Sequence, residues 1–231
     1  LTANTTGPGN TALGFKSMED NTTAGNGTGL GYNTLASNTT GDANTAVGSQ
    51  ALAANDAGNY NTAVGQNSLN DNTTANANTA VGYSALSLNV TGAGSTAIGS
   101  YAADAYTASY ITAVGYGAAG ATTTGGGNVA IGYNALSAQT TGDNNTAVGY
   151  EAMESTTTGT NNTAMGSQAL DAHTTSHSNA AFGFAAGGNI TTGQNNVCLG
   201  AQSGITGSPG GNVTTGSNTI LLGDENIAEA N

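Results

Sequence analysis

The chain has 231 residues, of which only 6% are charged, against roughly 25% in a typical soluble domain. Thirteen acidic residues stand against one basic residue, Lys16, and give a formal net charge of −12. Because phosphate binding needs Lys or Arg, this balance argues against nucleic acid and anionic membrane surfaces as partners. The sequence contains no apolar run of about 18 residues, so we expect no membrane insertion.

A glycine that follows an apolar residue recurs along nearly the whole chain. Of the twelve intervals between successive glycines of this kind, ten are 17 residues long, and the other two are 16 and 23. A disordered polar chain has no reason to keep such a count, so the spacing predicts an ordered repeat. This glycine column consists of Gly14, Gly31, Gly48, Gly65, Gly82, Gly99, Gly115, Gly132, Gly149, Gly166, Gly183, Gly200 and Gly223.

In chain order, each unit begins with a short segment of the type Asn-Thr-Ala-Val-Gly, as at residues 44–48, 61–65 and 78–82. The two-residue period of a β-strand places Thr and Val on one face and Asn, Ala and Gly on the other. Stacking such strands turns the asparagines into a side-chain amide ladder. The asparagine column includes Asn44, Asn61 and Asn78, the apolar column includes Val47, Val64 and Val81, and the glycine column includes Gly48, Gly65 and Gly82.

The rest of the unit contains a bend, a second short segment and a Thr-Thr-Gly turn. The second segment carries Leu or Met four residues after the glycine, a leucine column that includes Leu35, Leu52 and Leu136. Seven residues before the glycine stands a turn glycine column, including Gly41 and Gly125, where we expect positive φ. Two residues before the glycine, an alanine column contains Ala in ten of thirteen units. Cys198, the single cysteine, falls in this column, and we interpret it as a small buried hydrophobe.

A unit of this size cannot bury its own apolar face, so the units must stack. The repeated Gly and β-branched residues disfavour helix. We therefore predict an all-β parallel β-solenoid (β-roll) with one coil per 17 residues. Each coil offers about four apolar side chains, two of them usually Ala, which is a thin core for ordering about 17 residues. The deficit favours burial of the apolar column against other copies in a homotrimer. A thicker monomeric solenoid is the alternative.

The prediction divides the chain into residues 1–200, a solenoid repeat domain that is irregular at 99–115, and residues 201–231. The second part contains a projecting loop with Pro209-Gly210-Gly211, the last coil and a C-terminal transition segment. Leu1 opens directly in repeat-like sequence, so we expect the chain to be a segment of a longer fibre.

The unit at 44–48, followed by Ala51 and Leu52, resembles the head repeats of trimeric autotransporter adhesins. It resembles still more closely the repeat shafts of phage tail fibres, and the resemblance covers about residues 4 to 224. It implies a left-handed homotrimeric β-roll that works as a rigid segment of a virion tail fibre or a bacterial surface adhesin. Residues 218–227 look like the stretch that precedes the self-cleaving chaperone of many tail fibres. The adhesin repeat is usually shorter than 17 residues, so a larger outer loop is implied.

The shortened interval from Gly99 to Gly115 loses the Asn and Leu of the repeat and gathers four tyrosines. Exposed aromatic faces suit stacking on sugar, so these residues are the candidate receptor or glycan contacts. The alternative is local packing around the defect. The four are Tyr101, Tyr106, Tyr110 and Tyr116.

The carboxylates do not form a catalytic pair at any one place in the repeat. Asp42 and Asp143 share one turn position, Asp20 and Asp71 share another, and Glu151 with Glu154 reads as a pair of surface substitutions. We therefore expect no enzymatic activity and no cofactor.

Metal sites are disfavoured as well. His173 and His177, with Asp171 nearby, lie in a Thr/Ser turn rather than on a helix, and Asp224 with Glu225 lacks the spacing of a calcium loop.

Two further patterns have alternative readings. One Thr column lies three residues before the glycine, and pairs such as Thr22-Thr23 and Thr140-Thr141 recur at the turns. Regular Thr arrays resemble ice-binding solenoids, whereas ladder packing and turn chemistry explain them without ice. Asn-x-Thr sequons, as at Asn21 and Asn38, are glycosylation acceptors whose use depends on the host.

The expected function is structural and adhesive, in an extracellular host-attachment fibre of a virion or cell surface. The expected partners are further copies of the chain, adjoining fibre segments and a cell-surface glycan or protein receptor.

Overall fold

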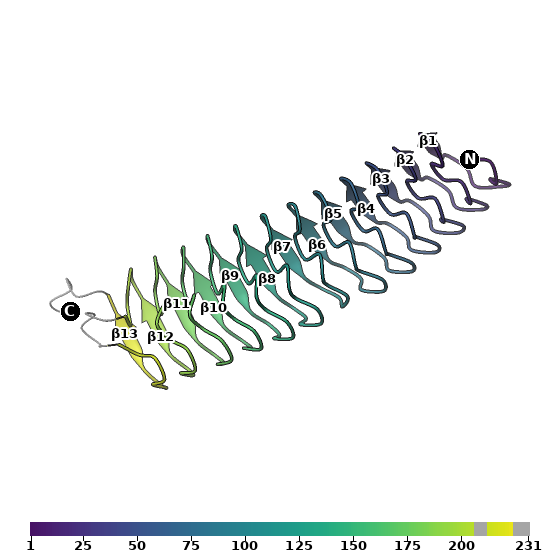
Figure 1. Ribbon diagram of the computed structural model, residues 1–231. Coiled ribbons are helices and arrows are strands. Elements are labelled where there is room, and N and C mark those ends of the chain that lie inside the picture. Colours follow the sequence, from purple (N-terminus) through teal and green to yellow (C-terminus); the bar gives the residue numbers. More distant parts are fainter. Residues whose placement is uncertain (206–211, 224–231) are drawn as a thin grey trace. The chain divides into compact units, whose positions relative to one another are not determined.

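The computed structural model describes residues 1–205 and 212–223, which belong to two compact units, Leu1–Tyr116 and Gly117–Asn231. Each unit is a stack of coils with one three-residue strand per coil, and the described residues contain no helix (Figure 1). The strands of the first unit are β1 (Thr11–Leu13), β2 (Thr28–Leu30), β3 (Thr45–Val47), β4 (Thr62–Val64), β5 (Thr79–Val81), β6 (Thr96–Ile98) and β7 (Thr112–Val114). The strands of the second unit are β8 (Val129–Ile131), β9 (Thr146–Val148), β10 (Thr163–Met165), β11 (Ala180–Phe182), β12 (Val197–Leu199) and β13 (Ile220–Leu222).

Successive strands within each unit pair in parallel and place equivalent residues of the repeat opposite one another. Thr45 pairs with Thr62 and Val47 with Val64, an offset of one repeat. The 16-residue interval pairs Thr96 with Thr112, and the 23-residue interval pairs Val197 with Ile220. Both irregular intervals are thus absorbed outside the strands. The parallel β-solenoid with 17-residue coils is confirmed.

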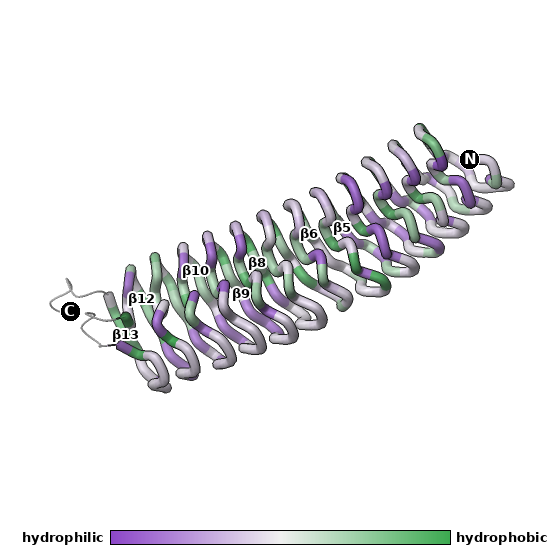
Figure 2. The backbone as a smooth tube through the Cα atoms, viewed as in Figure 1, coloured by the Kyte–Doolittle hydropathy of each residue, from purple (hydrophilic) through white to green (hydrophobic). Residues whose placement is uncertain are grey.

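The strands bury one face and expose the other, as the two-residue period predicts. In β3, β4 and β5 the central Ala is buried, while the flanking Thr and Val are half-buried. The inward face meets the leucine column, whose Leu35, Leu52 and Leu136 are fully buried. Residues of like hydropathy consequently recur from coil to coil within each unit (Figure 2).

The second segment of each coil is a pair of turns rather than a strand. The Leu and Met residues of the leucine column have φ between 47° and 54°, the left-handed region that costs an L-residue roughly 1–2 kcal/mol. The residue two after the glycine also has positive φ, as in Gln50 and Asn67. A third such position lies five residues before the glycine, as in Tyr60 and Ala77, and we call it the corner column. These reversals turn the leucine side chains inward.

The turn glycine column was predicted for the wrong reason. Gly41 and Gly125 do not have positive φ. A Cβ on Gly41 would collide with the carbonyl oxygen of Gly58 in the next coil and lie 2.6 Å from Asn38 Oδ1. Close approach between coils, and not backbone handedness, is what favours glycine at Gly41, although Ala24 and Ala75 show that some coils accept alanine at this column.

The asparagine column forms the predicted ladder. Oδ1 of Asn44 accepts a hydrogen bond of 2.9 Å from the backbone N–H of Asn61, and Nδ2 of Asn44 donates to the Gly58 carbonyl at 2.6 Å. In the second unit Asn145 bonds in the same way to Asn162 N–H at 3.0 Å and to Gly159 O at 2.7 Å. Each buried amide therefore joins one coil to the next through both of its polar ends.

A second buried column lies seven residues after each glycine, and we call it the inner polar column. In the first unit it is asparagine from Asn21 to Asn89, and Nδ2 of Asn55 donates to Asn38 Oδ1 at 2.6 Å and to the Gly58 carbonyl at 3.0 Å. The sequence prediction treated several of these residues only as sequons. The first unit contributes Asn21, Asn38, Asn55, Asn72, Asn89 and Tyr106 to this column, and the second contributes Thr122, Gln139, Thr156, His173 and Ile190.

Candidate functional site

The apolar column points away from the core in both units. Leu13 is 71% exposed and Ile98 41% exposed in the first unit, and Met165 is 45% exposed in the second. Val47, Val64 and Val81 on the same face are half-buried. Because the alternate residue of each strand is the buried alanine, the core cannot take up this column. Each unit thus presents an apolar stripe on the outer face of its strands.

A second exposed stripe, not anticipated from the sequence, follows directly after the glycine column. This aromatic column contains exposed Phe or Tyr rings, and the rings of adjacent coils stack. Phe15 and Tyr32 lie 5.8 Å apart at an interplanar angle of 12°, and Tyr133 and Tyr150 lie 5.3 Å apart at 10°. The members are Phe15, Tyr32, Tyr83 and Tyr116 in the first unit and Tyr133, Tyr150 and Phe184 in the second.

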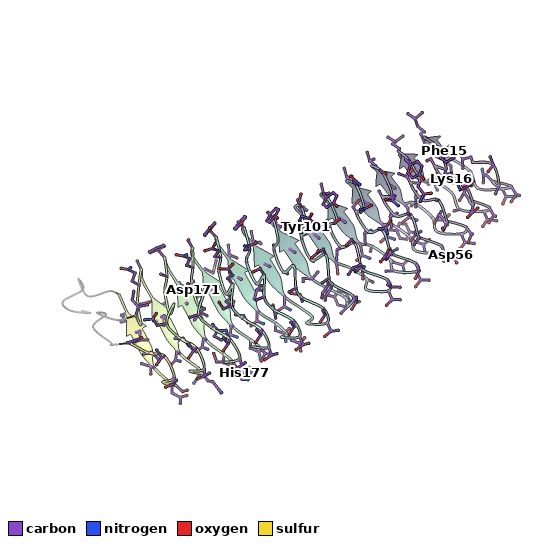
Figure 3. All side chains as sticks on the ribbon, viewed as in Figure 1. Phe15, Lys16, Asp56, Tyr101, Asp171 and His177 are labelled. Atoms are coloured by element: carbon purple, nitrogen blue, oxygen red, sulfur yellow. The ribbon has the colours of Figure 1, made fainter. Side chains whose placement is uncertain are left out.

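The irregular coil continues the aromatic stripe with a ring that comes one residue later in the sequence. Its residue in the aromatic column is Ser100, and the next residue, Tyr101, supplies the ring instead. Tyr101 has a φ of 58° and makes edge contacts with Tyr83 at 5.2 Å and with Tyr116 at 5.9 Å. Tyr101 lies on the same edge of the first unit as Phe15, opposite to Asp56 (Figure 3). Two of the four candidate tyrosines, Tyr101 and Tyr116, are therefore brought together.

The other two candidate tyrosines lie elsewhere. Tyr106 is fully buried in the inner polar column and donates a 2.6 Å hydrogen bond to the Ser109 carbonyl, so its assignment as a receptor contact is wrong. Its ring occupies the core of the coil that is one residue short, where Ile111 also replaces the usual Asn. Tyr110 is 70% exposed but lies in the corner column, beside Gly94.

The carboxylates at the turns accept hydrogen bonds from neighbouring coils. Asp42 is exposed and its Oδ1 accepts from the Gly25 N–H at 2.7 Å, while Asp143 does the same for Gly126 at 2.7 Å. Asp20 is exposed and Asp71 half-buried, each in a different coil of the first unit. These contacts match the interpretation of the Asp residues as turn residues.

The Glu pair also bonds between coils. Glu151 accepts from Gln168 Nε2 at 3.1 Å, and burial raises the pKa of Glu154, helped by the nearby charge of Glu151.

The two histidines lie in different columns. His173 is fully buried in the inner polar column, contrary to the expected turn position, and its Nδ1 lies 3.1 Å from Thr156 Oγ1. Burial, with a smaller contribution from His177, lowers the pKa of His173 to about 4. Nδ1 of His177 accepts from the Thr160 N–H at 3.2 Å. Over residues 1–205 and 212–223, no three His, Cys, Asp or Glu side chains form a group that could hold a metal ion.

The other residues singled out from the sequence either make contacts within the stack of coils or lie outside the described residues. Hydroxyls at the first Thr of each turn bond to the next coil, as Thr22 Oγ1 does to the Thr39 carbonyl at 3.0 Å. Cys198 is buried in the alanine column, as predicted, and burial raises the pKa of its thiol to about 11. The loop at 209–211 and the candidate calcium ligands Asp224 and Glu225 lie outside the described residues, as does the end of the 218–227 segment.

Comparisons with protein-family models, with curated proteins and with solved structures give no match to this chain. No helix long and apolar enough to cross a membrane occurs in the part of the chain that the structure describes. The two exposed stripes, and the repeat that carries them, are the features of this chain that indicate a function.

Proposed function

We propose that this chain is a structural and adhesive segment of an extracellular host-attachment fibre, most similar in kind to a phage tail fibre shaft. Three copies associate along their strand faces into a left-handed, rigid rod. The proposal gives the chain no catalytic role and no cofactor. A bacterial trimeric surface adhesin head is the second candidate, and an ice-binding solenoid is a third.

The outward apolar column carries the proposal. A solvent-facing strand surface in an isolated solenoid has no need of Val, Ile, Leu, Met and Phe at one position of every coil, because polar residues serve there equally well. Association along this face would bury the partly exposed Ile98 and Met165 side chains. At roughly 25 cal/mol per Å² of apolar surface, a contribution repeated in every coil adds to the thin core of each copy.

Rigidity follows from the ladders, and adhesion from repetition. Two columns of buried amides in the first unit, with backbone bonds between successive strands, oppose bending and slipping between coils. Three parallel copies present each surface feature three times, which raises avidity for a surface receptor. The Tyr83, Tyr101 and Tyr116 rings are the proposed receptor contact, since sugar rings stack on aromatic faces.

Native mass measurement tests the assembly. We expect a particle of three times the 22.2 kDa chain mass at micromolar concentration. Replacing both Val64 and Val81 with Asp should give a folded monomer, because both side chains are on the outer strand face. Tyr60→Asp, at an exposed corner of the same unit, is the matched control and should stay trimeric. A wild-type monomer would contradict the trimer.

Glycan-array binding tests the adhesive role. The double change Tyr101→Gln and Tyr116→Ser uses residues that the repeat already carries at these positions, Gln50 and Ser49. We expect at least about a tenfold loss of binding, since stacking on an aromatic ring is worth on the order of 1 kcal/mol each. If the wild-type chain binds a glycan and this variant binds it equally well, the receptor site lies elsewhere on the chain.

A thermal-hysteresis assay separates the ice-binding candidate, because only an ice-binding surface depresses the freezing point without changing the melting point.

A further inference from the structure

Seven of the ten Asn-x-Ser/Thr sequons of the chain fall into two structural classes, and the class of each is fixed by its place in the coil. The other three sequons, at Asn4, Asn189 and Asn212, belong to neither class, since Asn4 and Asn189 are half-buried and Asn212 is exposed outside the corner column. One class belongs to the inner polar column and has buried side chains, namely Asn21, Asn38, Asn72 and Asn89. Another belongs to the exposed corner column, namely Asn26, Asn144 and Asn161.

In the buried class, the atom that would carry a glycan already donates hydrogen bonds within the stack, two of them in the case of Asn72. Nδ2 of Asn72 donates to Asn55 Oδ1 at 2.6 Å and to the Ala75 carbonyl at 3.3 Å. Nδ2 of Asn38 donates to the Gly41 carbonyl at 3.0 Å. Oligosaccharyl transfer forms a bond from Nδ2 to the anomeric carbon of a lipid-linked oligosaccharide, breaks the bond from that carbon to the diphosphate, and removes one proton from Nδ2. The modified amide could not make both contacts.

The space around the buried class is smaller than a methyl group. A Cβ on Gly41 would lie 2.6 Å from Asn38 Oδ1 and 2.8 Å from Asn55 Nδ2. Backbone and amide groups of adjacent coils thus lie directly against one another at this turn, as Gly41 does against Asn38 and Asn55. A sugar ring on Nδ2 would therefore separate two coils, and it would break the strand pairing that depends on their contact.

The corner class has the opposite environment. Asn26, Asn144 and Asn161 are exposed, and each occupies a left-handed turn with φ between 56° and 58°. The hydroxyl residue of each sequon is the Thr that begins β2, β9 or β10. A glycan at these positions projects from the turn and displaces no core contact.

We propose that this solenoid accepts N-glycans at its corner asparagines, and that a glycan on any of the four buried sequon asparagines prevents the coil from forming. Since the transferase acts on a chain before it folds, the four buried sequons are folding hazards in any compartment that contains the enzyme. The chain consequently folds efficiently only where such transfer does not occur. This inference does not depend on the proposed fibre function.

The test is expression of the full 231-residue chain behind a secretion signal in a eukaryotic cell, with glycan sites mapped by mass spectrometry in protease-resistant and aggregated fractions. We expect corner glycans in the resistant fraction and buried-site glycans only in the aggregated fraction. A resistant protein with a glycan at Asn21, Asn38, Asn72 or Asn89 would overturn the proposal. Resistant protein with no glycan at Asn26, Asn144 or Asn161 would overturn its corner half.

A matched variant removes the four hazards without touching the amides. Thr23→Ala, Thr40→Ala, Thr74→Ala and Thr91→Ala destroy the buried sequons, and all four threonines are exposed. Ala57 already occupies this position in the coil of Asn55. We expect the variant to raise the resistant yield in the secretory cell at least about threefold, and to leave the yield from bacterial cytoplasm unchanged. A variant yield no higher than wild type in the secretory cell would contradict the hazard.

Discussion

The units Leu1–Tyr116 and Gly117–Asn231 share one coil but fill its inner polar column differently. The first unit has consecutive asparagines there, bonded one to the next from Asn21 to Asn72, and in this column of the first unit only Asn72 Oδ1 lacks a protein partner. The second unit has mixed residues, and Thr122 Oγ1, Gln139 Oε1 and His173 Nε2 lack one. A buried polar atom without a partner costs roughly 1–3 kcal/mol. The comparison shows that the ladder of the asparagine column is sufficient for the coil. A second ladder, in the inner polar column, forms only where asparagine recurs in successive coils.

The largest expected effect is one that the two units share. Gly48→Ala and Gly183→Ala each place a Cβ 2.7 Å from a glycine carbonyl carbon of the next coil, at φ of 120° and 134°. We expect each change to reduce the free energy of unfolding by about 3 kcal/mol or more, because neither the backbone nor the neighbouring coil can adjust. Denaturant unfolding of the full chain measures it. A much smaller loss at Gly183 would mean that the second unit is the more adaptable stack.

The second prediction concerns acid and applies to the second unit alone. The pKa of His173 is about 4 in the folded state, below its ordinary value of 6.5. The unfolded chain therefore takes up the proton first as pH falls, and stability is lost between pH 6.5 and 4. The shift corresponds to roughly 3 kcal/mol at pH 4. His173→Asn should remove this part of the pH dependence. At acid pH, hydrogen exchange should show that His173→Asn protects the coils around β10 and β11 relative to wild type. Equal protection across residues 1–116 would contradict the prediction.

The third prediction separates the two versions of the inner polar column. Asn55→Ala removes three hydrogen bonds, two from its own Nδ2 and one that its Oδ1 accepts from Asn72 at 2.6 Å. We expect a loss of roughly 2 kcal/mol in unfolding free energy. Thr122→Val, the matched change in the second unit, removes only a hydroxyl without a protein partner. It should be neutral or stabilising by up to about 1 kcal/mol. Equal losses for the two variants would show that the columns do not differ in the way described.

The smallest effect is on reactivity. Burial and a pKa near 11 should keep the Cys198 thiol unreactive toward disulfide reagents at neutral pH until the coil opens. Ala80→Cys places a thiol in the same column of the first unit, where the side chain is also fully buried. The ratio of the two labelling rates compares local opening in the two units. We expect slower labelling at position 80, because the inner polar column of the first unit has fewer unpartnered atoms. Faster labelling there would mean that the first unit opens more readily than the second.

Much of the fold could be predicted from the sequence because the repeat is a strict count. The glycine spacing gave the coil, and the two-residue period gave the inward alanines and the outward Val47, Val64 and Val81. The aromatic column also has a sequence signal, since Phe or Tyr follows the glycine in seven coils. The inner polar column has one too, although the sequons at Asn21 and Asn38 suggest surface positions instead.

Other features had no sequence signal of the usual kind. Left-handed φ at Leu35 and Leu52 runs against the preference of every residue that carries a Cβ. It is imposed by the need to turn leucine inward within two tight bends. The turn glycines were recognised, but their cause was a contact with the next coil, which local turn rules do not describe. Tyr106 in the core likewise follows from a missing residue rather than from its own chemistry.

The identical register of successive strands has a consequence for how such a gene changes length. Thr45 faces Thr62 as Thr62 faces Thr79, so a coil of regular length can be excised or copied whole and the new neighbours keep the same strand register. Recombination between repeats is then tolerated in steps of one complete turn, each worth about 4.8 Å of reach. The protein can therefore become longer or shorter in evolution without any change in how its strands pair.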